Sequence, residues 1–139
     1  MKRCFADTVY WLALTNRHDQ YHEKAIEVST VLGECHLVMT EAVLTEFLNA
    51  LAEAGPHIRA AGVAMVEAIQ RNTLVTVISQ SDRLFNKSLA LYKARPDKGY
   101  SLTDCTSMVV MKDRRLREAL TADRHFEQEG FKALLRTTH

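Results

Sequence analysis

Four acidic side chains stand where an α/β protein could bring them together for chemistry. Asp7 and Asp123 each follow a short apolar run typical of a strand, Asp104 lies in the first turn of a predicted helix, and Glu46 lies nearly two turns into another. Carboxylates that converge repel one another, and a hard divalent cation such as Mg²⁺ or Mn²⁺ relieves this repulsion. Such a cation can activate water and stabilise charge on a phosphodiester, so the acids suggest hydrolysis of a nucleic acid.

The elements that must position these acids alternate between strands and helices. We expect strands at residues 3–6, 36–40, 74–79, 118–122 and 132–136, and helices at 8–16, 20–32, 41–54, 58–71, 81–95 and 101–115. This order, β-α-α-β-α-α-β-α-α-β-β, predicts one α/β domain over residues 1–139. Its sheet should be mostly parallel, with about five strands and helices on both faces, a three-layer α/β/α sandwich. Because open parallel sheets bind ligands beyond the carboxyl ends of their strands, the four acids are expected to share one edge.

Each acid also has a purely structural interpretation. Asp7 could cap the helix that begins at Thr8, because aspartate accepts hydrogen bonds from free backbone N–H groups. Ser101 and Asp104 form the S-x-x-D pattern of a capping box, a spacing that occurs again in this chain and is not specific. Glu46 shares a helix with several apolar residues, and a buried carboxylate without a partner is costly. Glu46 is therefore expected to have a partner.

The motifs that contain these acids resemble those of PIN domains. They are FADT at residues 5–8, TEAVLTEF at 40–47, SLTDC at 101–105 and LTADRHFEQEGF at 120–131. In order and spacing they are most similar to the successive motifs of VapC-type ribonuclease toxins of toxin–antitoxin pairs. The similarity covers nearly the whole chain. It implies a parallel sheet with helices on both sides and Mg²⁺- or Mn²⁺-dependent cleavage of RNA.

The resemblance also implies roles for individual residues. The family's catalytic and metal-binding acids fall on Asp7, Glu46, Asp104 and Asp123, with Asp7 and Asp104 as the most direct metal ligands. Thr121 matches a hydroxyl residue of the family, and Thr8 follows the first acid, so both are expected to steady the site or contact substrate. Arg124 is expected to contact substrate on a separate ground, its positive charge beside Asp123. The family further implies an RNA substrate, a homodimer and a cognate antitoxin protein that covers the groove and masks the acids.

Composition limits the partners and the compartment. The net charge is +1, from 18 basic and 17 acidic residues, so RNA contacts must come from local side chains such as Arg124 and Lys98. Three scattered cysteines form neither a zinc pattern nor a disulfide framework, and an odd number of thiols favours a reducing cytoplasm. No segment has the length of a membrane span. We therefore expect a cytoplasmic protein that does not contact the membrane.

Other functions fit the residues less well. A receiver-type phosphoacceptor module also places aspartates around Mg²⁺, but Ala6 and Thr8 flank Asp7 where that module needs an adjacent acidic pair. Dehalogenase-like phosphatases need D-x-D at this point, and Val9 interrupts it. A PIN-like module that binds RNA or protein without cutting is the main alternative, and the four intact acids argue against it.

Three further features are expected to be structural. Cys105 follows an acid of the set, but no base is placed beside it, so we interpret it as a buried helical thiol. His18 and His22 have the i, i+4 spacing of a zinc pair without the rest of that motif, and are expected to be exposed. The basic residues within 112–117 fit a solvated helix end.

Overall fold

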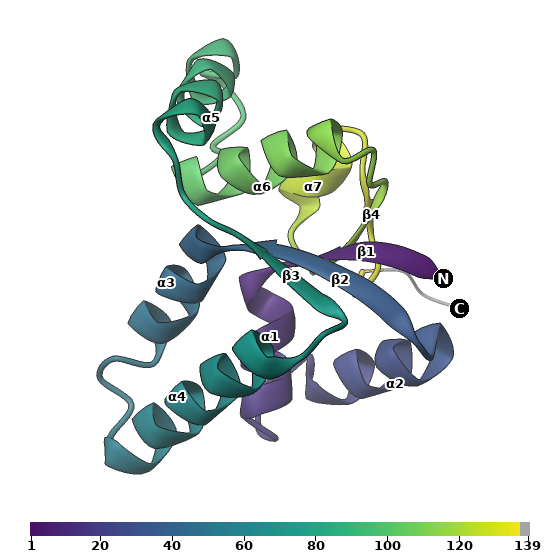
Figure 1. The fold of residues 1–139 in the computed structure, drawn as a ribbon, viewed down its shortest axis with the longest axis vertical. Helices are drawn as coiled ribbons and strands as arrows, with labels where there is room; N and C mark the ends of the chain where they lie inside the picture. Colours follow the sequence, from purple (N-terminus) through teal and green to yellow (C-terminus); the bar gives the residue numbers. More distant parts are fainter. Residues whose placement is uncertain (137–139) are drawn as a thin grey trace.

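A computed structural model describes residues 1–136, in which five strands and seven helices alternate (Figure 1). The strands are β1 (Lys2–Ala6), β2 (Cys35–Thr40), β3 (Val75–Ile78), β4 (Glu118–Leu120) and β5 (Lys132–Ala133). The helices are α1 (Thr8–Thr15), α2 (His22–Leu32), α3 (Glu41–Ala50), α4 (Pro56–Arg71), α5 (Asp82–Ala94), α6 (Leu102–Asp113) and α7 (Arg124–Gln128). The expected α/β class is confirmed.

The sheet is parallel throughout, with the strand order β3-β2-β1-β4-β5. β1 lies at its centre, where Phe5 is paired with Val38 of β2 on one side and with Ala119 of β4 on the other. From β1 the chain first builds the sheet outward through β2 and β3, then returns to add β4 and β5 on the opposite side. The strand order therefore reverses between β1 and β4, and such a switch point is where open α/β sheets bind ligands.

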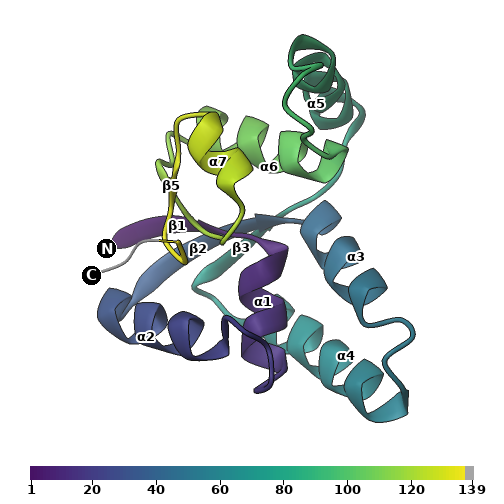
Figure 2. The same ribbon diagram turned by 180° about the vertical axis from the view of Figure 1, so that it is seen from behind.

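The helices cover both faces of the sheet. α1, α2, α3 and α4 lie on one face, and α5, α6 and α7 lie on the other, as Figures 1 and 2 show from opposite sides. Cys4, Phe5 and Ala6 of β1 are all fully buried, because a parallel strand covered on both faces has no solvent side. α3 also contacts α6 at the edge of the sheet, which brings the two layers together beside the carboxyl ends of the strands.

The end of the chain differs from the predicted pattern. β4 and β5 were expected as consecutive strands, but α7 lies between them, because parallel neighbours need a crossover connection. α7 is only five residues long and buries one large side chain, Phe126, so its sequence has no helical period to detect. The predicted helix 41–54 is also too long, since α3 ends at Ala50.

Among residues 1–136, no helix combines the length and apolar character needed to cross a membrane. Cys4, Cys35 and Cys105 are all buried free thiols. Cys105 is fully buried within α6, which confirms its interpretation as a buried helical thiol, and burial raises its pKa.

Candidate active site

Asp7 lies at the switch point, directly after β1, and is 5% exposed. Its backbone N–H donates to the carbonyl oxygen of Leu120 at 3.2 Å, which ties it to the end of β4. The hydroxyl of Thr121 donates to Asp7 Oδ2 at 2.7 Å. Although Asp7 occupies the N-cap position of α1, its side chain makes no capping hydrogen bond. Asp7 is therefore the N-cap residue by position, but its side chain does not cap the helix.

The electrostatic environment of Asp7 is unfavourable to its charge. Burial raises the pKa of Asp7 to about 7, against the lowering effect of hydrogen bonds from Thr121 and from the Thr8 backbone. The negative charges of Asp104 and Glu46 also raise it. A cation would stabilise the charge of a buried carboxylate that has two further acids nearby.

Glu46 reaches the site from the middle of α3. The hydroxyl of Thr8 donates to Glu46 Oε1 at 2.5 Å, so the expected partner of this half-buried acid is the residue that follows Asp7. α3 itself begins where β2 ends, because the Thr40 side chain caps the helix by accepting from the Val43 backbone N–H at 3.2 Å. The direct passage from strand into helix is what carries Glu46 to the carboxyl edge of the sheet.

Asp104 caps α6 and also faces the other predicted site residues. It forms the predicted capping box at the start of α6, where Asp104 Oδ2 accepts from the Ser101 backbone N–H at 3.0 Å and the Ser101 hydroxyl accepts from the Asp104 N–H at 3.0 Å. The same Oδ2 atom lies 3.4 Å from Nδ1 of His125. Capping therefore fixes the carboxylate without turning it away from the other acids.

Asp123 lies after β4 and is the N-cap residue of α7. Its backbone N–H donates to the Thr121 hydroxyl oxygen at 3.1 Å, and its Oδ1 accepts from the His125 backbone N–H at 2.9 Å. Since the Thr121 hydroxyl also donates to Asp7, this one side chain joins the first and last acids. Thr121 is fully buried, so water cannot replace its hydroxyl as the hydrogen-bond partner of Asp7 and of the Asp123 backbone.

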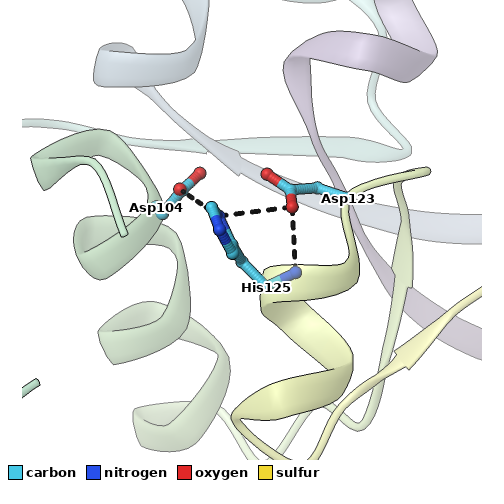
Figure 3. Close-up of side chains that lie close together, drawn as sticks. All are labelled: Asp104, Asp123 and His125. Carbon is cyan, nitrogen blue, oxygen red and sulfur yellow. Dashed lines mark hydrogen bonds and ion pairs between the residues drawn. The ribbon is translucent and has the colours of Figure 1, made fainter. Parts of the chain in front are cut away.

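Figure 3 shows Asp104, Asp123 and His125 facing one another from α6 and from the start of α7. One ligand atom of each lies within 4.8 Å of the others, an arrangement that could hold a metal ion. Carboxylate oxygens suit Mg²⁺ and Mn²⁺, and imidazole is a ligand of many transition ions, so the two carboxylates of this group fit the expected cofactor. His125 was absent from the predicted site, and its only sequence signal was its position two residues after Asp123.

The contacts therefore connect all four predicted acids at one edge of the sheet. Thr121 links Asp7 to Asp123, His125 lies between Asp123 and Asp104, and Glu46 is bonded to the residue after Asp7. Their roles as catalytic residues and metal ligands stay predictions, as do the substrate contacts of Thr8, Thr121 and Arg124. Arg124 is exposed at the first position of α7.

A groove of about 530 Å³ opens beside Glu46. It is lined by Glu41, Ala42, Thr45, Glu46, Asn49, Gln80 and Thr103. No lysine or arginine belongs to this lining, which instead combines two carboxylates with amide and hydroxyl groups. The groove reaches from the surface of α3 to the first turn of α6, one residue before Asp104.

The pair His18 and His22 forms no metal site within the described residues. Nδ1 of His22 lies 2.6 Å from the carbonyl oxygen of Ala13, and the group of potential ligands found in residues 1–136 includes neither histidine. His18 is exposed, as expected, whereas His22 is partly buried. The zinc interpretation is therefore unsupported by the structure.

No protein-family model matches the chain, and no curated protein does either. Its structure is similar to that of VapC20 from Mycobacterium tuberculosis, described as a sarcin-ricin loop cleaving toxin, with a TM-score of 0.82 and 26% sequence identity. The similarity covers 92% of this chain and 95% of VapC20. The chain therefore has the PIN-like α/β/α fold, and the resemblance to VapC-type toxins that its motifs indicate is confirmed at the level of structure.

Proposed function

We propose that this protein is a metal-dependent endoribonuclease that hydrolyses RNA phosphodiester bonds, and that it is the toxin of a type II toxin–antitoxin pair. One observation carries the proposal: carboxylates from four separated segments meet at the switch point of a parallel sheet whose fold is similar to that of an RNA-loop-cleaving toxin. Such a cluster is unfavourable without a cation, and a cation there is suited to phosphodiester chemistry.

Asp7, Asp104 and Asp123 would hold a Mg²⁺ or Mn²⁺ ion, with Glu46 completing the acidic set. When bound, such an ion supplies Lewis acidity toward a phosphodiester oxygen and lowers the pKa of water. The burial of Asp7 strengthens these charge interactions, because the effective dielectric constant is lower there than in bulk water.

The neighbouring hydroxyl groups position the acids. Thr121 fixes one oxygen of Asp7 and at the same time orients the Asp123 backbone, so the first and last carboxylates are held as a unit. Thr8 donates to Glu46 and holds that side chain toward the end of β1. Preorganised acids of this kind need no rearrangement when charge develops on the substrate.

RNA meets the protein at two chemically different surfaces in this proposal. The groove beside Glu46 has two glutamates and no basic residue in its lining, so we infer that it receives uncharged parts of the RNA, the bases and riboses. Arg124, exposed beside Asp123, is suited to a phosphate of the backbone. A hairpin loop of ribosomal RNA is the first substrate to test, because VapC20 is described as cleaving the sarcin-ricin loop.

The proposal includes the assembly expected of such a toxin: a homodimer and a cognate antitoxin that masks the acids. A cytoplasmic location belongs to it as well, because the proposed substrate and antitoxin are intracellular. Co-purification with the product of a neighbouring reading frame and loss of cleavage on its addition would test the antitoxin directly.

The cleavage experiment uses a labelled RNA hairpin that carries the sarcin-ricin loop, with Mn²⁺ or Mg²⁺. The wild type should cut it at defined positions, EDTA should stop the reaction, and Asp7→Asn and Asp104→Asn should be inactive. Asp82→Asn is the matched control, since Asp82 is an exposed aspartate in the first turn of α5, outside the acidic set. Cutting by Asp7→Asn and Asp104→Asn at the wild-type rate would identify a contaminant and reject the enzyme. Binding without cutting would favour the non-catalytic alternative.

A further inference from the structure

His125 lies between two carboxylates of the proposed site (Figure 3). Its Nδ1 is 3.4 Å from Asp104 Oδ2 and 3.3 Å from Asp123 Oδ1. Its side chain is one quarter exposed, so the ring lies at the rim of the acidic set. Nothing in the proposed hydrolysis requires an imidazole here, and its position calls for a separate explanation.

The two separations suit shared coordination better than hydrogen bonding. Both exceed the roughly 2.9 Å of a good N–H···O hydrogen bond. Neighbouring ligands at right angles on one ion, with bonds of about 2.1 Å, are roughly 3 Å apart. The separations from His125 Nδ1 to the two carboxylates are therefore close to those of neighbouring ligands on one cation, and all three donor atoms lie within 4.8 Å of one another.

Contacts with neighbouring residues also fix the orientation of the His125 ring. It packs against Tyr100, with ring centroids 5.3 Å apart, and the His125 backbone N–H is bonded to Asp123. Tyr100 is 5% exposed and donates its hydroxyl to Glu129 at 3.0 Å, and Glu129 is paired with Arg95. These contacts restrict the directions that the His125 ring can take.

We propose that His125 is a nitrogen ligand of the bound cation and that it makes the site select a first-row transition ion such as Mn²⁺ over Mg²⁺. Mg²⁺ keeps to oxygen ligands and waters, whereas transition ions accept imidazole more readily. This inference rests on one part of the proposed function, that the acids bind a cation. It concerns which ion the protein binds and does not depend on which RNA it cleaves.

The first test is isothermal titration of the metal-free wild type and of His125→Ala with Mn²⁺ and, separately, Mg²⁺. The wild type should bind Mn²⁺ more tightly than Mg²⁺, and His125→Ala should lose about tenfold or more in Mn²⁺ affinity while its Mg²⁺ affinity changes far less. His18→Ala is the matched control, because His18 is an exposed loop histidine that hydrogen-bonds to Asn16 through its backbone N–H, which the substitution keeps. Equal losses for both ions, or no loss, would overturn the proposal.

The second test starts from the wild type, so its first result depends on no variant. Pulsed electron paramagnetic resonance of the Mn²⁺-loaded wild type should show hyperfine coupling to a histidine ¹⁴N nucleus. The coupling should persist in His18→Ala and disappear in His125→Ala, whose fold is checked by circular dichroism. Absence of nitrogen coupling in the wild type would reject His125 as a ligand.

These outcomes separate the two proposals. Nitrogen coupling with no RNA cleavage would keep the metal site and reject the ribonuclease. Metal-dependent cleavage without nitrogen coupling would keep the ribonuclease and reject the role of His125.

Discussion

Replacing Thr121 with valine removes one hydroxyl group from the centre of the site and almost nothing else. The two side chains have nearly the same shape, and residue 121 is fully buried, so the variant keeps its packing. The hydroxyl donates to Asp7 at 2.7 Å and accepts from the Asp123 backbone N–H at 3.1 Å, and both bonds are lost.

The expected cost follows from these two bonds. A hydrogen bond to a charged group contributes about 1.5–3 kcal/mol, and a buried donor left without a partner costs about 1–3 kcal/mol. Because the two losses share one side chain and are not additive, we expect Thr121→Val to lower the free energy of unfolding by about 2–4 kcal/mol. Thr121→Ser keeps the hydroxyl and loses only a methyl group, at about 1 kcal/mol.

Urea denaturation of metal-free protein measures the stability, and the RNA-hairpin assay measures activity. The valine variant should also lose about tenfold or more of the cleavage rate, because removing a group that orients a ligand weakens a metal site. Thr121→Ser should stay close to wild type in that assay. If Thr121→Val were as stable and as active as Thr121→Ser, the hydroxyl would not couple Asp7 to Asp123, and the reasoning would be refuted.

Three other predictions follow from the charges and burial of single residues. Although burial opposes it, hydrogen bonds from Arg95 and Lys112 lower the pKa of Glu129 to about 2, so its contribution is present above the ordinary value of 4.5 and is lost as pH falls toward 2. Glu129→Gln should cost about 2–3 kcal/mol in urea denaturation at pH 7 and clearly less at pH 3, and an equal cost at both would contradict this. Asp7→Asn, which removes a charge whose burial raises the pKa of Asp7 to about 7, should abolish cleavage yet melt at or above the wild-type temperature in EDTA at pH 8. A large drop in melting temperature would disprove that. Cys105, whose pKa is raised by burial, should react with iodoacetamide far more slowly in the native protein than in urea, and equal rates would count against its burial.

The sequence was sufficient for the parts of the fold that have strong local patterns. The apolar runs of β1, β2 and β3 and the amphipathic helices between them are predicted within a few residues of their observed bounds. From these elements alone, Asp7 and Glu46 are expected at the carboxyl edge of a parallel sheet, which is where they lie. The alternation of strands and helices is enough to place these two acids, because right-handed crossovers allow few sheet topologies.

The parts of the fold and site that the sequence does not predict depend on contacts between distant segments of the chain. β5 has two paired residues and α7 has five residues, so neither has a period that a local pattern could reveal. His125 could not be placed from the sequence for the same reason, since its direction depends on the short helix α7 and on the contact with Tyr100. Asp104 illustrates a different limit: its capping pattern was recognised, but only the structure shows that capping and a place in the site are compatible.

Anomalous diffraction from crystals soaked in Mn²⁺ tests the central claim most directly, because it locates the ion rather than its effects. We predict a strong peak bounded by the carboxylates of Asp7, Asp104 and Asp123, on the side of the cluster that His125 faces, and no such peak in Asp104→Asn. A manganese peak elsewhere on the molecule, with these carboxylates left without an ion at saturating Mn²⁺, would contradict the claim.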